Sequence, residues 1–146
     1  MGLIDDLVDG PVAIDAAILI YLVQEHPKYL PVIRPLFQQA SRGQRELITS
    51  ALTLLEVLVM PYQKGNRALA ERYNELLHRS RGFRMVEITR DQVRAAAQLR
   101  AVTGVKTPDA LQMTAALAAG CRILITNDRR LPSVPGLRII QLASYT

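Results

Sequence analysis

The sequence predicts an α/β fold in three α/β/α layers, with a central parallel sheet of four to five strands. Short apolar segments alternate with longer helical ones, and strands separated by helices are typical of a parallel sheet covered on both faces. Gly43, Gly65, Gly104 and Gly120 mark the expected ends of helices. The chain has 146 residues and shows no repeat or linker, so we expect one domain over residues 1–146.

The five expected strands differ in polarity, and this difference predicts their order. The first and fourth contain the unbroken apolar runs Val12–Ile14 and Ile123–Ile125, as expected of strands buried on both sides. The third and fifth carry charged residues or glutamine, which suits the edges of a sheet. We therefore expect the first and fourth strands to be central and adjacent. The expected strands are 11–15, 46–50, 83–88, 121–126 and 137–142, and the expected helices are 16–25, 30–42, 53–59, 66–79, 91–102 and 107–119.

This order predicts a crevice at the carboxyl ends of the first and fourth strands, where ligands bind in open α/β sheets. Four of the 13 acidic residues fall at this end of the sheet. Asp15 ends the first strand, and Asp128 follows the fourth strand by two residues. Glu56 lies in the first turn of the helix that follows the second strand. Asp109 lies in the first turn of the helix that begins at Thr107. We expect the four carboxylates to face the same edge.

Three of these acids also have a purely structural interpretation. Glu56 can close a capping box with Thr53. Asp109 can lie near the positive end of a helix dipole, after Thr107 as N-cap and a proline at the first helical position. Asp128 can be a turn residue. Taken singly, each of the three is explained at least as well without a ligand.

Asp15 is harder to explain in this way, because it lies between Ile14 and the apolar segment 16–20. An isolated carboxylate there would be badly desolvated, although it can also cap the following helix. Two carboxylates at about 4 Å repel each other by roughly 1 to 4 kcal/mol at the dielectric of water or of a protein surface. Protons or a cation must offset that repulsion, and oxygen-only ligands favour Mg²⁺ or Mn²⁺. The four acids together therefore predict a metal site.

Composition limits the class of function. The net charge of +5 suits a polyanionic partner such as nucleic acid, and an arginine-rich soluble protein explains it equally well. The longest apolar run, residues 16–23, is too short to cross a bilayer. Residues 1–9 contain three aspartates, unlike the basic start of a signal peptide, and the single Cys121 excludes an internal disulfide. We expect a cytoplasmic protein without membrane contact.

Four segments of the chain together resemble the PIN-domain family, and more closely the VapC-type ribonuclease toxins of prokaryotic toxin–antitoxin pairs. The similarity runs from about Val12 to Leu142. The resemblance implies a Mg²⁺- or Mn²⁺-dependent ribonuclease in which three acids hold the metal and Glu56 completes the catalytic set. The segments are VAIDAAILIYL around Asp15, SALTLLEVLVMPYQKG around Glu56, KTPDALQMTAALAAGC around Asp109 and ILITNDRRL around Asp128. The implied metal ligands are Asp15, Asp109 and Asp128.

The resemblance also implies roles for neighbouring residues. Thr126 matches the family's supporting hydroxyl before the last acid, and we group Asn127 with it as a supporting residue. The family often has serine or threonine one or two residues after the first aspartate, but alanine occupies both places here, so neither of these two positions offers Asp15 a hydroxyl. The candidates for contact with RNA are Arg129, Arg130 and Lys106. Exposure to solvent without any ligand explains these three residues equally well.

The resemblance further implies two protein partners, a cognate antitoxin and a second copy of the chain. The helix around Glu56 has almost no polar face, as in a helix buried on all sides. Burial in the core and burial against a partner both explain that pattern.

Other functions share part of the pattern. A phosphatase of the haloacid-dehalogenase type needs a second aspartate two residues after the first, where this chain has Ala17. A response-regulator receiver needs an aspartate at the end of the third strand, where this chain has residues 87–89, Glu-Ile-Thr. A catalytically inactive PIN-like module for RNA binding or regulation is the remaining alternative. Loss of an acid would be its usual signature, and all four are present.

Overall fold

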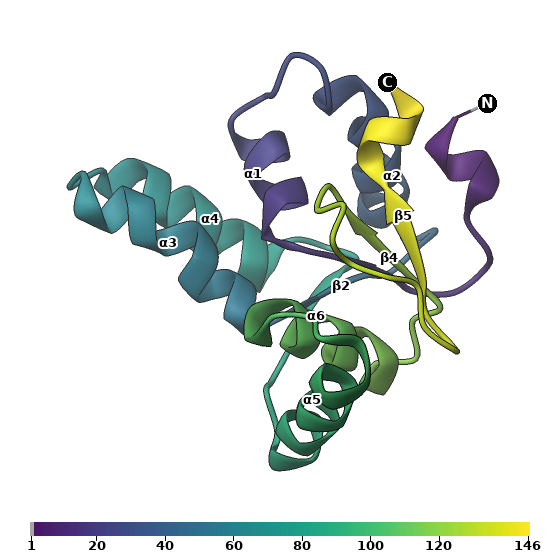
Figure 1. The fold of residues 1–146 in the computed structure, drawn as a ribbon. Helices are drawn as coiled ribbons and strands as arrows, with labels where there is room; N and C mark the ends of the chain where they lie inside the picture. The colour runs from purple at the N-terminus through teal and green to yellow at the C-terminus, as the bar shows by residue number, and fades with distance from the viewer. Residues whose placement is uncertain (1) are drawn as a thin grey trace.

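A parallel sheet forms the middle layer of the structure, a computed structural model that describes residues 2–146 (Figure 1). Within these residues the sheet has five strands in the order β3–β2–β1–β4–β5, and every neighbouring pair is parallel. β1 and β4 are central and adjacent, as predicted, with Ala13 paired to Leu124 and Ile14 to Ile125. The strands are β1 (Val12–Ile14), β2 (Leu47–Ser50), β3 (Phe83–Val86), β4 (Ile123–Thr126) and β5 (Arg138–Gln141).

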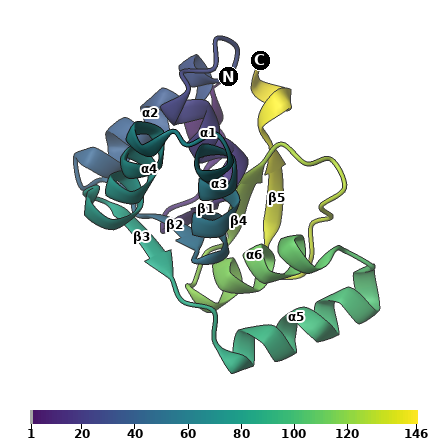
Figure 2. The same ribbon diagram turned by 90° about the vertical axis from the view of Figure 1, so that its left-hand side faces the viewer.

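Helices cover both faces of the sheet, which confirms the predicted three layers (Figure 2). α1, α2, α3 and α4 lie on one side, and α5 and α6 lie on the other. Two short 3-10 helices, η1 and η2, lie near the two ends of the described chain. The bounds are η1 (Leu3–Asp6), α1 (Ala16–Val23), α2 (Leu30–Ser41), α3 (Leu52–Gln63), α4 (Arg67–Arg79), α5 (Arg90–Thr103), α6 (Thr107–Ala118) and η2 (Leu142–Tyr145).

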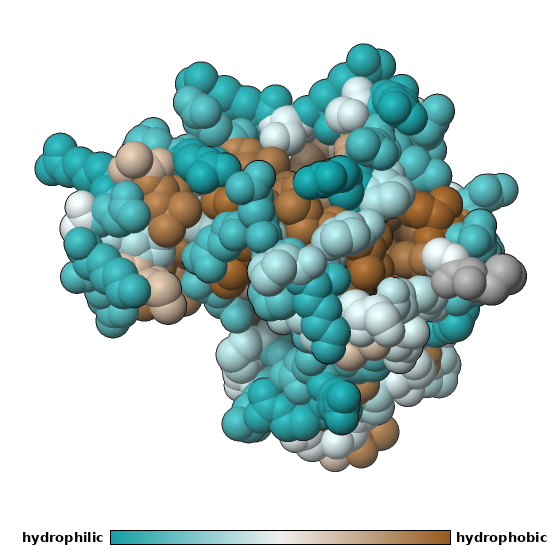
Figure 3. Space-filling view, turned by 90° about the horizontal axis from the view of Figure 1, so that it is seen from above, coloured by the Kyte–Doolittle hydropathy of each residue, from teal (hydrophilic) through white to brown (hydrophobic). Residues whose placement is uncertain are grey.

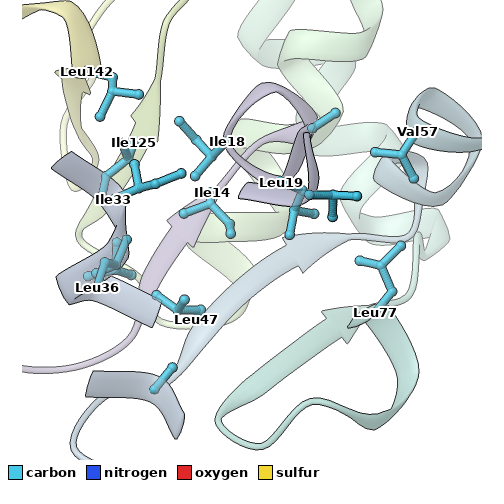
Figure 4. Packing of buried hydrophobic residues seen from close by; sticks show 14 of the residues in the cluster. Ile14, Ile18, Leu19, Ile33, Leu36, Leu47, Val57, Leu77, Ile125 and Leu142 are labelled. Carbon is cyan, nitrogen blue, oxygen red and sulfur yellow. The ribbon is translucent and has the colours of Figure 1, made fainter. Parts of the chain in front are cut away.

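The apolar run of β1 is unbroken because each face of the strand contacts a separate core. Val12 and Ile14 pack among α1, α2 and the strand residues that point the same way, and Ile14 is fully buried (Figure 4). Ala13 points to the opposite side, into the cluster of α5 and α6. Successive side chains of a strand point to opposite faces, so both kinds of position must be apolar in a doubly covered strand.

Most element boundaries differ from the predicted ones by one or two residues, and the end of α3 differs by four. α3 runs to Gln63 rather than ending at 59, and the buried Pro61 lies inside it. A proline cannot donate the helical hydrogen bond, so the packing of α3 against α4 must offset that loss. β3 stops at Val86, two residues early. β1 stops at Ile14 because the next residue already caps α1.

α3 and α4 form a hairpin that projects beyond the sheet (Figure 1). Figure 3 shows hydrophobic surface among hydrophilic side chains on this projecting part. The exposed large apolar side chains of α3 are Leu55, Val59, Met60 and Tyr62. No helix formed by residues 2–146 has the length and apolar character that a membrane span requires.

Candidate functional site

A pocket of about 390 Å³ opens at the carboxyl ends of β1 and β4, the two strands from which the chain connections leave in opposite directions. All four predicted acids line it, which confirms that they face one edge of the sheet. The lining residues are Asp15, Ala16, Ala17, Tyr21, Glu56, Asp109, Gln112, Asn127, Asp128 and Arg129.

Asp15 has two structural partners inside this pocket. Its Oδ1 accepts a hydrogen bond of 3.1 Å from the Ala17 amide, so Asp15 is the N-cap of α1. Its Oδ2 accepts a short bond of 2.5 Å from the Thr126 hydroxyl. Burial raises the pKa of Asp15 to about 6, although the bond from Thr126 opposes that rise. The carboxyl is therefore held in a fixed orientation at the floor of the pocket.

Thr126 connects the first and last of the four acids. Its side chain is fully buried, and its hydroxyl oxygen accepts a bond of 3.0 Å from the Asp128 amide while donating to Asp15. The two acids thus share one buried hydroxyl across neighbouring strands. This contact is consistent with the supporting position that the sequence suggested.

Asp128 combines the turn geometry and the pocket position that the sequence suggested as alternatives. Its carboxylate accepts bonds from the Arg130 amide at 2.9 Å, from Nε at 3.0 Å and from Nη2 at 2.8 Å. The Arg130 side chain lowers the pKa of Asp128 below its usual value. In this conformation the Arg130 guanidinium is occupied by Asp128, whereas the exposed Arg129 lines the pocket and carries no such ion pair within residues 2–146.

Glu56 enters the pocket from α3, but the predicted capping box is wrong. α3 begins at Leu52 with Ala51 as N-cap, so Glu56 lies in the second helical turn rather than the first. Thr53 lies inside the helix, and its hydroxyl contacts a neighbouring threonine and Gln112 instead of an N-terminal amide. The Glu56 carboxylate accepts a bond of 3.1 Å from Gln112 Nε2. Tertiary contacts therefore replace the local cap.

Asp109 lies in the first turn of α6, as predicted, although the predicted N-cap is displaced by one residue. Lys106 is the N-cap, because the Thr107 hydroxyl instead accepts a bond of 2.9 Å from Arg100. Burial raises the pKa of Asp109, and the charge of Asp128 raises it further. The positive charges of Arg130 and Lys106 oppose that rise. The pKa of Glu56 is raised by burial and, to a smaller extent, by Asp109.

Sequence reasoning missed two residues of the pocket. Gln112 follows Asp109 by three positions and so lies on the same face of α6, which is a signal that the spacing carries. Tyr21 accepts a bond of 3.2 Å from the side chain of Asn127. The Asn127 oxygen accepts another of 3.2 Å from the Ala143 amide. No short-range pattern links a tyrosine of α1 to the loop after β4, so this contact is visible only in the fold.

The four acids offer the type of ligand atom that a hard divalent cation binds. All four acids supply oxygen, which Mg²⁺ and Mn²⁺ prefer, and burial with mutual repulsion raises the pKa of Asp15, Glu56 and Asp109. Among residues 2–146, however, no three Asp, Glu, His or Cys side chains already stand in a metal-binding arrangement. The Asp128 carboxylate is turned to Arg130, which competes with an ion for its two oxygen atoms.

The family model described as the PIN domain matches residues 12–137, and the chain belongs to that family. No curated protein sequence matches it significantly.

Solved structures show the same fold at low sequence identity. VapBC2 from Rickettsia felis bound to a promoter DNA fragment has 17% identity and a TM-score of 0.70, covering 90% of this chain and 98% of that one. DNA-bound VapBC from Salmonella typhimurium has 19% identity and a TM-score of 0.64, covering 92% and 99%. A toxin–antitoxin complex from Klebsiella pneumoniae has 23% identity and a TM-score of 0.62, covering 87% and 95%.

Proposed function

We propose that the protein is a ribonuclease that depends on Mg²⁺ or Mn²⁺, hydrolyses RNA phosphodiester bonds and acts as the toxin of a toxin–antitoxin pair. The observation that carries this proposal is the convergence of four carboxylates in one pocket at the switch point of a PIN domain. An inactive RNA-binding module would need no such set of acids, because their mutual repulsion opposes folding. We assign the activity to one domain over residues 1–146.

Asp15, Asp109 and Asp128 would hold the metal. A bound divalent ion lowers the pKa of water and offsets the charge of the phosphate that the acids would otherwise repel. Thr126 keeps the Asp15 carboxylate in one orientation through the bond of 2.5 Å. Glu56 lines the same pocket and would orient the attacking water and accept its proton. No side chain is needed as a nucleophile.

The basic residues at the pocket edge suit the backbone of RNA. Arg129 lines the pocket and is exposed, and Lys106 is exposed at the start of α6, three residues before Asp109. Arg130 would become available for a phosphate once Asp128 turns to a cation. Arginine can contact a phosphate through two parallel bonds, which orients the strand as well as binding it.

The proposed partners are a cognate antitoxin and a second copy of the chain. Two of the structural neighbours are VapBC assemblies and a third is a toxin–antitoxin complex. The exposed apolar side chains of α3 support a protein interface there, because solvent contact of several large apolar groups on one helix is unfavourable. We expect the protein to act in the cytoplasm, where RNA and an antitoxin are both accessible.

The first test is cleavage of a mixed RNA pool by purified protein with Mn²⁺ or Mg²⁺. Parallel reactions contain a chelator or the Asp15→Asn variant. Cutting that requires both the metal and Asp15 supports the ribonuclease, and the cut ends define its sequence preference. Folded protein that is free of antitoxin, cuts no RNA and binds no Mn²⁺ would refute the catalytic proposal and favour a non-catalytic RNA-binding module.

A further inference from the structure

A chain of buried polar side chains runs beneath the pocket and ends at Glu56. Thr49 Oγ1 lies 2.7 Å from the carbonyl oxygen of Ile14, and Thr53 Oγ1 lies 2.7 Å from Thr49 Oγ1. Gln112 Nε2 lies 2.8 Å from Thr53 Oγ1 and 3.1 Å from Glu56 Oε1. The chain therefore joins β1, β2, α3 and α6, which are far apart in the sequence.

The donor and acceptor in each of these bonds follow from the chemistry of the groups. The Ile14 carbonyl can only accept, so Thr49 donates its single hydroxyl proton to it. Thr53 must then donate to Thr49, and its oxygen is left to accept from Gln112. The group facing Thr53 is therefore the NH₂ of the glutamine amide, whose second N–H points to Glu56. Every proton in the chain has one acceptor.

The chain is buried up to Gln112, and Glu56 is its more accessible end. The exposed fractions of Thr49, Thr53 and Gln112 are 2%, 0% and 5%. Breaking one of their bonds would leave a desolvated polar group without a partner, which is unfavourable. The Glu56 residue is exposed on one side while its carboxylate is partly buried in the pocket, and the bond from Gln112 is the one hydrogen bond that this carboxylate receives within residues 2–146.

We propose that Gln112 is a positioning residue that holds the Glu56 carboxylate in its place across the pocket from Asp15. This inference rests on the proposed function, in which Glu56 acts on the attacking water. The Ile14 carbonyl at the other end of the chain belongs to the residue directly before Asp15. One buried network thus fixes the position of Glu56 relative to the strand end that carries the first acid. Without Gln112, the exposed glutamate has no protein group to select one rotamer.

The experiment compares three variants of α6 in steady-state RNA cleavage with saturating Mn²⁺. Gln112→Met removes both N–H donors and keeps the length of the side chain. Gln112→Asn keeps the amide but is one methylene too short to reach Glu56. The matched control is Thr114→Val, because Thr114 is also 5% exposed on α6 and its hydroxyl bonds only to carbonyls of its own helix.

Both Gln112 variants are expected to lower kcat by about 10- to 100-fold, as for other residues that orient a catalytic group. KM and the Mn²⁺ dissociation constant from calorimetry should stay within about twofold of wild type, as should the kcat of Thr114→Val. In a Glu56→Ala background, Gln112→Met should have almost no further effect, because it acts through the missing carboxylate. A residue that matters only for stability would lower activity in both backgrounds.

A second readout needs no catalysis. In metal-free protein, the ¹⁵N–¹H signals of the Gln112 side-chain amide should shift on Glu56→Ala and not on the control Glu71→Ala, an exposed acid of α4. Gln112→Met with the kcat of the Thr114→Val control, or an unshifted amide signal, would overturn the inference while leaving the proposed ribonuclease intact. Wild-type protein that cuts no RNA would overturn the proposed function and this inference with it.

Discussion

Replacing Asp15 by asparagine is expected to stabilise the metal-free protein at neutral pH while removing its activity. The pKa of Asp15 is about 6 in the fold, against 3.8 for the ordinary carboxyl. Because the folded pKa is the higher one, the ionised carboxylate destabilises the fold, and this destabilisation disappears as pH falls through 6 toward 3.8. Asparagine also caps helices well, so α1 keeps its N-cap.

The difference between the two pKa values sets the magnitude of the effect. At pH 7.5 a change from 3.8 to about 6 corresponds to about 3 kcal/mol, since each pKa unit is worth about 1.4 kcal/mol. At pH 4.5 the carboxyl of the folded protein is already protonated, and the same two pKa values then give a destabilisation of about 1 kcal/mol. The value of about 3 kcal/mol at pH 7.5 is an upper limit, because the Asp15 carboxyl lines a pocket that is open to solvent.

The assay is urea unfolding of wild type and Asp15→Asn in the presence of chelator, at pH 7.5 and at pH 4.5. The variant should show the higher free energy of unfolding at pH 7.5, and its advantage should shrink at pH 4.5. An Asp15→Asn variant that is no more stable than wild type at pH 7.5, or whose gain does not depend on pH, would contradict the account of a desolvated carboxylate.

Three further predictions concern the surroundings of the site and the fold. Thr126→Val should lower kcat about 10- to 100-fold in the RNA assay, because the acids on either side lose their shared hydroxyl. Arg130→Ala should raise the pKa of Asp128 toward its usual value and tighten Mn²⁺ binding in calorimetry, because the carboxylate is no longer occupied; unchanged affinity would contradict this. Gly82→Ala should lower the free energy of unfolding by about 2 kcal/mol or more, because an added Cβ would clash with a backbone carbonyl of α2. Gly104→Ala shares the positive φ without the clash, so its urea transition should shift less.

The order of the strands was predictable because it depends on burial, which the sequence displays directly. The runs Val12–Ile14 and Ile123–Ile125 are apolar at every position, and that pattern fits only strands with helices on both faces. The placement of Asp15 and Asp128 followed from the strand ends. An acid that closely follows a central parallel strand must lie at the edge of the sheet where the carboxyl ends of the strands meet.

The contacts of Glu56 were not predictable by the same means. Thr53 and Glu56 have the spacing of a capping box, but the helix begins at Leu52, and the threonine hydroxyl instead joins a buried network with Gln112. Capping motifs and helix propensities depend only on residues that are close in the sequence, whereas this hydrogen bond joins two residues that are 59 positions apart. The spacing of Gln112 after Asp109 carried a usable signal, since three positions along a helix place two side chains on one face.

β5 supplies no acid to the pocket, but its last residue and the segment after it help to position Asp128. Gln141 at the end of β5 donates a bond of 2.9 Å to the Asp128 carbonyl, and the Ala143 amide in η2 bonds to the side chain of Asn127. The loop that carries Asp128 is therefore braced by the final residues of the sequence. Tyr145 extends the brace to η1 through its bond to Asp6. Removing residues 143–146, which leaves the fully buried Leu142 in the core, should accordingly impair catalysis at temperatures where the sheet is still folded, because this peripheral segment helps to position Asp128.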